Sequence, residues 1–130
     1  YGFDCSLYNA ARILELWSRR DASFSSELNR LAPNLPTTGE VKVPCAEEDK
    51  LATVAAITSA FDDHESSTID GVRVRFEKDG RQSGWYLARK SNTEAILVMR
   101  VEANDQETLD EILAMIDERV SPIIDISKLL

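Results

Sequence analysis

Five consecutive polar residues, 90–94, separate two apolar stretches of this sequence, and Arg89 precedes them. These residue types suit phosphate binding. Arg89 offers a planar fork of N–H donors for two phosphate oxygens. Ser91 and Thr93 add hydroxyls, and Asn92 adds an amide and tolerates a positive φ, which would let backbone N–H groups converge on one anion. A hairpin loop whose polar side chains only satisfy the turn uses the same residue types, so both interpretations stay open on composition.

Other residues offer less chemistry. His64 is the single histidine and has no nucleophile beside it, so we interpret it as a solvated loop residue. Cys5 and Cys45 lie far apart without a Cys-x-x-Cys pattern, and we expect reduced, largely buried thiols. No Gly-rich phosphate loop, G-x-S-x-G or H-E-x-x-H pattern occurs. We therefore expect no catalytic residue and no metal ligand in this sequence.

The charge pattern favours a small anionic ligand. The 130 residues carry a net charge of −8, which argues against a nucleic-acid partner. Residues 71–101, however, carry a net charge of +4 and form a basic island. Arg73 and Arg75 in that island alternate with valines, so we assign them to the solvent face of a strand. No apolar run approaches the roughly 20 residues of a membrane span, and we expect a cytoplasmic protein without a membrane partner.

The elements before the polar stretch suggest two parts. Residues 3–20 and 23–32 have the apolar spacing of amphipathic helices. Residues 33–40 contain Pro33, Pro36 and Gly39, a composition typical of a linker. We therefore predict a helical part over residues 1–33 and a second domain over residues 34–130. Because the sequence starts at Tyr1 rather than at a methionine, we interpret it as a piece of a longer protein.

The second domain has the pattern of an α+β fold. Strands are expected at 40–45, 69–77, 85–89 and 95–103, a turn at 78–84, and helices at 46–61 and 104–120. The first helix should begin with its acidic residues in the first turn and bury Leu51, Val54, Ala55, Thr58 and Phe61. The second should start with a capping box of Asn104 and Glu107 and bury Leu109, Ile112, Leu113, Ile116 and Val120. The order β-α-β-β-β-α predicts a four-stranded, mainly antiparallel sheet with two helices on one face, preceded by two remnant helices.

A family resemblance covers nearly the whole chain. The sequence "GVRVRFE…GWYLARKSNTEAILVMRVEANDQET" resembles the C-terminal domain of the α-D-phosphohexomutases, and Arg-x-Ser-Asn-Thr resembles their phosphate-binding loop. The asparagine after the serine resembles the loop sequence of the phosphomannomutase/phosphoglucomutase branch of that family. The stretch "YGFDCSLYNAARILELW" is similar to the end of that family's third domain. One difference is Ala95, which stands where many members have a proline that would stiffen the loop exit.

The resemblance implies a function and its limits. Arg89, Ser91, Asn92 and Thr93 would hold the phosphate at the non-reacting end of a hexose phosphate, whereas Lys90 falls at a variable position. In such enzymes a phosphoserine of the first domain exchanges phosphate with the sugar through a bisphosphorylated intermediate. A Mg²⁺ ion is held by the second domain, and the third reads the sugar. Those motifs are absent from this sequence. The other domains of the same chain would thus be partners of this domain, which should be inactive alone. The alternative is a stand-alone anion-binding or interaction module.

Overall fold

The computed structural model describes residues 5–31 and 34–130, and the chain divides into two compact units, residues 1–34 and 35–130. Pro33, part of the predicted linker, lies outside the described residues. None of the described helices combines the length and the apolar character that a transmembrane span requires. Cys45 is buried as expected, whereas Cys5 is only half-buried, and both thiols are free.

The first unit contains two helices, α1 (Ser6–Trp17) and α2 (Phe24–Leu31). Trp17 and Phe24 join them in an edge-to-face contact with ring centroids 4.9 Å apart. Neither helix has a buried residue, and large apolar side chains such as Leu7 are 83% exposed. The amphipathic faces predicted from the sequence therefore find little cover within this unit.

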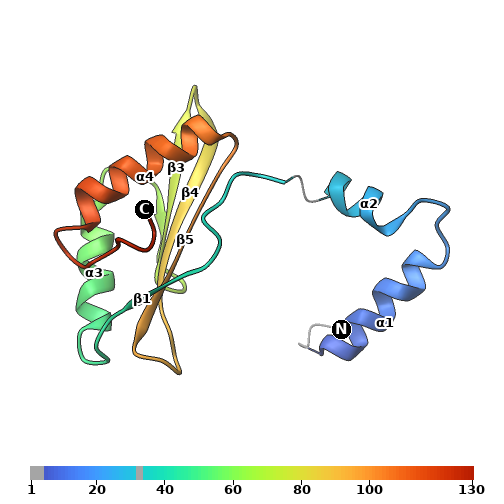
Figure 1. Ribbon diagram of the computed structural model, residues 1–130, viewed down its shortest axis with the longest axis horizontal. Coiled ribbons are helices and arrows are strands. Elements are labelled where there is room, and N and C mark those ends of the chain that lie inside the picture. The colour runs from blue at the N-terminus through green and yellow to red at the C-terminus, as the bar shows by residue number, and fades with distance from the viewer. Residues whose placement is uncertain (1–4, 32–33) are drawn as a thin grey trace. The chain divides into compact units, whose positions relative to one another are not determined.

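The second unit is an α+β domain built on a five-stranded antiparallel sheet (Figure 1). The strands are β1 (Val41–Pro44), β2 (Ser66–Ser67), β3 (Val72–Lys78), β4 (Arg81–Lys90) and β5 (Ile96–Ala103). Their order across the sheet is β1-β5-β4-β3-β2, so β4 and β5 are inner strands. The predicted count of four strands is wrong because the two-residue strand β2 adds an edge. The element order is accordingly β-α-β-β-β-β-α.

Tertiary pairing extends the sheet beyond the predicted bounds. The predicted turn over residues 78–84 shrinks to Asp79 and Gly80, which both have positive φ (55° and 70°), so β4 begins already at Arg81. The predicted linker is also partly sheet-like. Thr38 N donates to Val101 O at 3.1 Å, and Ala103 N donates to Pro36 O at 3.0 Å. Residues 36–38 are thus bound to β5.

Two helices, α3 (Lys50–Ala60) and α4 (Gln106–Val120), cover one face of the sheet (Figure 1). The core between the layers is formed by alternate strand residues and by the inner faces of the helices. Gly84 allows a close approach here, because a Cβ at this position would lie 2.5 Å from Ile112 Cδ1. The C-terminal tail completes the core with Ile126 and Leu129, which are 1% and 4% exposed.

The buried face of α3 differs from the predicted one. Lys50 and Ile57 are buried within the helix and Phe61 at its end, whereas Leu51 is 70% exposed and Ala55 is exposed. Residues 46–49 form a turn, so the acidic residues precede the helix and do not occupy its first turn. The inward stripe runs through positions 50, 54, 57 and 61, and hydropathy misplaced it because its first member is a lysine.

The N-cap of α4 also lies one residue later than predicted. Asp105 is the N-cap, and its Oδ1 accepts from Thr108 N at 2.8 Å, a bond that lowers the pKa of this carboxyl. Asn104 instead donates through its side-chain amide to Gln82 O at 3.0 Å. Of the predicted buried stripe, Leu109, Ile112, Ile116 and Val120 are buried and Leu113 is half-buried.

An ion pair connects α4 to the segment after α3. Arg119 donates to both carboxylate oxygens of Asp63 at 2.6 and 3.0 Å, and to Ala60 O at 3.0 Å. His64 Nδ1 lies 2.9 Å from Asp63 Oδ1, and the ring packs edge-on against Phe61 and Phe76. His64 lies between α3 and β2 as a loop residue, as predicted, but it is less solvated than expected because two aromatic rings pack against its side chain. The hydrogen bonds from Arg119, and to a smaller extent the one with His64, hold the pKa of Asp63 well below its ordinary value.

The lowered pKa of Asp63 predicts a pH-dependent contribution to stability. Because the folded state favours the ionised carboxylate, the contribution should be complete at neutral pH and should fade as the pH drops below about 4. Asp63→Asn should therefore lower the Tm at pH 7, and its difference from wild type should shrink in acid. Thermal melts at several pH values measure this, with the neighbouring Asp62→Asn as control. A difference that grows below pH 4 would contradict the assignment.

Candidate functional site

The polar stretch singled out in the sequence forms the loop between the two inner strands. Arg89 lies near the end of β4 opposite Val98, and residues 91–95 connect β4 to β5. Ser91 N donates to Ile96 O at 3.1 Å and closes the base of the hairpin. We call residues 91–95 the β4–β5 loop. Because both strands have partners on either side, the loop rises from the middle of the sheet.

The Ser91 side chain shapes this loop from within. Its Oγ accepts hydrogen bonds from Thr93 N at 3.3 Å and from Glu94 N at 3.1 Å. Two successive backbone N–H groups therefore converge, but on a hydroxyl of the loop itself. Asn92 does not adopt the positive φ that its residue type tolerates, since Asp79 is the only non-glycine residue with positive φ in the described part of the chain. The serine hydroxyl replaces a left-handed residue in turning the backbone.

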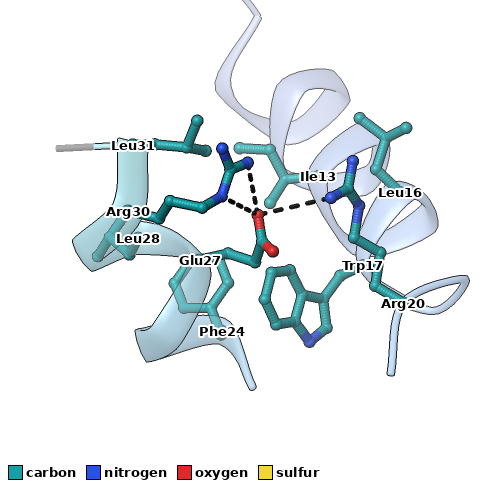
Figure 2. Close-up of a pocket in the computed structure, with 9 residues that line it drawn as sticks. All are labelled: Ile13, Leu16, Trp17, Arg20, Phe24, Glu27, Leu28, Arg30 and Leu31. Atoms are coloured by element: carbon teal, nitrogen blue, oxygen red, sulfur yellow. Dashed lines mark hydrogen bonds and ion pairs between the residues drawn. The ribbon is translucent and has the colours of Figure 1, made fainter. Parts of the chain in front are cut away.

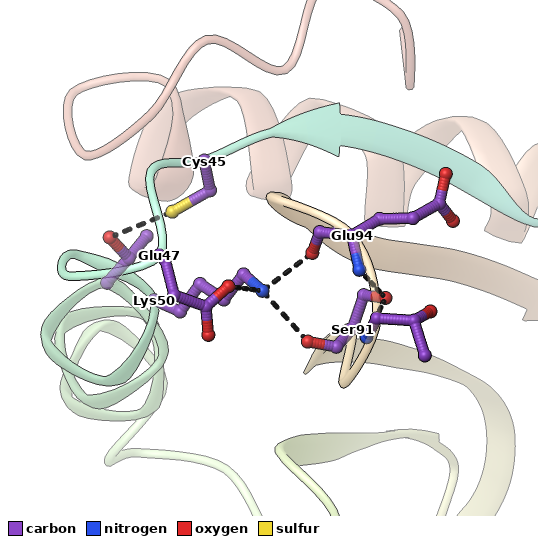
Figure 3. Close-up of polar contacts among 7 residues, drawn as sticks. Cys45, Glu47, Lys50, Ser91 and Glu94 are labelled. Carbon is purple, nitrogen blue, oxygen red and sulfur yellow. Dashed lines mark hydrogen bonds and ion pairs between the residues drawn. The ribbon is translucent and has the colours of Figure 1, made fainter.

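A buried lysine holds the loop from the side of α3 (Figure 3). Lys50 is 1% exposed, and its Nζ donates to Ser91 O at 2.9 Å and to Glu94 O at 2.6 Å. The third partner is the Glu47 carboxylate. Cys45 N adds a backbone hydrogen bond to Ala95 O at 3.1 Å. The loop carbonyls are thus bound by two donor groups, Cys45 N directly after β1 and Lys50 Nζ at the start of α3.

Arg89 lies on the other face of the sheet, which carries no helix. Its neighbour Ala88 is fully buried beneath the helices, and alternation along β4 turns Arg89 the other way. The Arg89 side chain is 34% exposed, and Nη1 lies 3.8 Å from Asp70 Oδ2. This is a loose ion pair with a carboxylate that is itself 70% exposed. The guanidinium therefore keeps most of its donors available to a ligand.

A glycine supports the backbone at Arg89. Gly71 has φ +77°, and a Cβ added there would lie 2.3 Å from Ala88 O and 2.6 Å from Arg89 Cα. Any side chain at position 71 would collide with the backbone that carries the guanidinium. Gly71 therefore lets the segment before β3 pass directly against Arg89.

The remaining predicted site residues, Asn92 and Thr93, lie in the loop with side chains that are not bound to other described groups of the protein. Within the described residues, the side chains of Asn92 and Thr93 form no hydrogen bond, and both residues are exposed. Lys90, set aside at the sequence level, is also exposed. The loop keeps its shape through its backbone and Ser91, which leaves the other polar groups free to bind a ligand.

Basic residues also line the helix-free face beside Arg89. Arg73 and Arg100 approach the Trp85 ring, with guanidinium carbons 4.8 and 5.7 Å from its centroid. Arg75 pairs with Glu65 at 3.1 Å and with Glu77 at 3.0 Å. As predicted, Arg73 and Arg75 lie on the outer face of a strand, β3. Arg89 is distinguished from them by its position next to the loop.

Two further features of the described residues do not fit a binding site for a metal or a phosphate. The described residues contain no group of three or more His, Cys, Asp and Glu side chains placed to hold a metal ion. In the first unit, a hollow of about 360 Å³ lies between α1 and α2 (Figure 2). Its lining is mostly apolar, and its one carboxylate, Glu27, is bound by Arg30 at 2.9 Å and Arg20 at 3.5 Å. A mostly apolar lining whose two arginines are paired with a carboxylate does not fit a phosphate.

Sequence reasoning missed Lys50 and Gly71 as parts of the site. The start of the predicted helix already accounts for the charged residues 47–50, and nothing local shows that the Lys50 ammonium reaches a loop 41 positions away. Gly71 falls within the strand predicted over residues 69–77, and its contact with Arg89 depends on the pairing of that strand. The only local signal was the lysine itself, at the first position of an otherwise apolar helical face.

Comparisons with known proteins place these observations in a family context. Residues 40–119 match the family described as phosphoglucomutase/phosphomannomutase, C-terminal domain. The chain is 34% identical to a phosphomannomutase/phosphoglucomutase of Pseudomonas syringae pv. tomato, an alignment that covers 97% of the chain and 27% of that protein. It is 40% identical to a phosphoglucomutase of Neisseria meningitidis serogroup B, over 86% of the chain and 24% of the relative.

A solved structure gives the same result in three dimensions. The chain resembles a phosphoglucomutase/phosphomannomutase family protein from Burkholderia thailandensis with a TM-score of 0.72 and 31% sequence identity. The match covers 95% of this chain and 25% of that one. The chain thus spans about a quarter of the length of the proteins that it matches.

Proposed function

This chain belongs to the phosphoglucomutase/phosphomannomutase family, whose C-terminal domain it matches, and on that premise we propose that its β4–β5 loop binds the phosphate of a hexose phosphate. Arg89 would grip two phosphate oxygens, while the hydroxyls of Ser91 and Thr93 and the amide of Asn92 would donate to the others. The observation that carries this proposal is that the Asn92 and Thr93 side chains form no hydrogen bond within the described residues and Arg89 forms only a loose ion pair, beside a loop that keeps its shape without these three side chains.

Ser91 can serve the loop and the ligand together. Its oxygen accepts two backbone hydrogen bonds, and its O–H remains a donor for a phosphate oxygen. Ala95 fits a family position where proline is common, because the Ala95 N–H forms no hydrogen bond within the described residues. A proline there would remove no bond from the loop.

The whole enzyme would interconvert hexose 1-phosphates and 6-phosphates of mannose and glucose through a bisphosphorylated intermediate. A clamp that recognises only the phosphate binds either end of the sugar alike, so each oxygen can be presented in turn to one phosphorylated serine. We assign that serine, the Mg²⁺ site and the sugar-reading loop to the other domains of the same chain, which would be partners of this one. We also propose a cytoplasmic location, where sugar phosphates are found.

The proposal predicts that residues 1–130 alone have no mutase activity. The purified chain should not convert mannose 1-phosphate or glucose 1-phosphate, whereas the longer protein containing it should convert both. Turnover that copurifies with residues 1–130 would contradict the assignment. If the longer protein also lacks activity but binds phosphate through Arg89, the alternative of a non-enzymatic anion-binding module holds.

We further propose that residues 1–33 are the end of a preceding domain. Their two helices bury no residue, and the second unit holds its own core and five-stranded sheet. Deleting residues 1–33 should therefore leave a domain that melts cooperatively with nearly unchanged Tm. Loss of the cooperative melt would show that the helices belong to the fold of the second unit.

A further inference from the structure

Lys50 occupies an unusual place for a lysine. Its side chain is 1% exposed, and α3 begins at this residue, at the end of a helix where a cation is disfavoured. Burial of an ammonium is costly unless hydrogen-bond acceptors replace its water. Here three acceptors do so, and two of them are carbonyl oxygens of the β4–β5 loop, Ser91 O and Glu94 O (Figure 3).

These bonds also set the direction of the loop's amides. No described peptide bond is cis, and in a trans peptide the N–H points opposite to the C=O. The Ser91 and Glu94 carbonyls point to Lys50, so the N–H groups of Asn92 and Ala95 point away from it. Neither N–H forms a hydrogen bond within the described residues. Lys50 thus turns electronegative oxygens inward and leaves amide donors directed outward.

We propose that Lys50 is a positioning residue for phosphate binding, which acts by fixing the backbone of the β4–β5 loop. This inference rests on the proposed function of the loop. Without the ammonium, Ser91 O would lose its donor, and Glu94 O would keep only Ile96 N at 2.8 Å. The Ser91 carbonyl above all could then turn toward the ligand, where it would repel a phosphate. Packing of α3 does not require the charge, because an apolar side chain of similar length would fill the same space.

Lys50→Met in the full-length enzyme tests the inference, because methionine keeps the apolar stem and removes the donors. The KM for glucose 1-phosphate and the inhibition constant of inorganic phosphate should both rise about ten-fold, with kcat changed much less. Amide hydrogen exchange at residues 92–95 should accelerate. If this variant does not fold, Lys50→Gln keeps a polar group in the buried site but cannot span both carbonyls, and the same shifts are expected.

Lys42→Met is the matched control. Lys42 Nζ binds the Glu94 carboxylate at 2.7 Å, but its side chain is 62% exposed and it donates to no loop carbonyl. This variant removes a positive charge beside the same loop, so it reports the general electrostatic effect. Phosphate binding and loop exchange should stay close to wild type.

The outcomes separate the inference from the proposed function. A folded Lys50 variant that binds inorganic phosphate as wild type does, or that shows wild-type exchange at residues 92–95, overturns the positioning role. An equal loss of phosphate binding in Lys42→Met also overturns it, in favour of a general charge effect. The proposed function is judged by Arg89→Ala in the same assay. If Arg89→Ala fails to weaken phosphate binding, the proposed clamp itself is wrong.

Discussion

Arg89→Ala in the full-length enzyme should lower kcat/KM for mannose 1-phosphate and glucose 1-phosphate by similar factors of roughly ten to a hundred. The guanidinium would contact the phosphate, which the two substrates share, and not the sugar on which they differ. Folding should change little, because the Arg89 side chain is one-third exposed on the helix-free face and contributes no core volume. Kinetics with both substrates, together with melting curves, give the measurement.

Two variants sharpen this prediction. Arg89→Lys should recover only part of the loss, since an ammonium cannot bind two oxygens with a planar fork. Asp70→Asn removes the carboxylate that lies 3.8 Å from the guanidinium, and it should leave kcat/KM no lower than wild type. If Arg89→Ala leaves both ratios unchanged in a folded protein, the β4–β5 loop is only a turn.

Gly71→Ala should destabilise the domain by about 2–4 kcal/mol. The alanine would adopt a left-handed backbone conformation, and its Cβ would lie 2.3 Å from Ala88 O in the centre of the sheet. Main-chain atoms cannot rotate away as a side chain can, so β4 would shift or the β3–β4 pairing would open near Arg89. Urea unfolding of wild type and variant gives the difference in free energy of unfolding.

Gly39→Ala separates the two causes. Gly39 also has a positive φ, +69°, but an added Cβ would meet no atom within 4 Å. This variant should therefore show only the backbone strain, about 1 kcal/mol. Equal costs at positions 39 and 71 would contradict the collision with β4. Because the collision involves the backbone of Arg89, Gly71→Ala should also reduce kcat/KM in its folded fraction, and Gly39→Ala should not.

The sequence predicted well those features that depend on local pattern. Alternation of Val72, Val74 and Phe76 with polar residues located β3 and its buried face, and all three are buried. Residues 91–94 of the polar stretch lie between β4 and β5 as predicted, whereas Lys90 still belongs to β4. The α+β class followed from the order of these segments.

The features that the sequence did not predict depend on distant contacts. Ser66 and Ser67 have no strand pattern and become β2 only because they pair with β3. The face of α3 was rotated because hydropathy treats Lys50 as a surface residue, although two carbonyls from 41 and 44 positions away bury it. The residue types of the proposed site could thus be listed from the sequence, whereas the groups that support its loop could not.

The anchoring of the β4–β5 loop has a consequence for how this surface can evolve. The donors Lys50 Nζ and Cys45 N bind backbone carbonyls, which every amino acid supplies. Among the loop side chains, Ser91 shapes the loop from within and the Glu94 carboxylate pairs with Lys42 of β1, whereas within the described residues the side chains of Asn92 and Thr93 take no part in this anchoring. If the loop binds phosphate as proposed, mutations at positions 92 and 93 would alter what it recognises while its scaffold is inherited unchanged, so ligand preference and loop architecture could diverge independently.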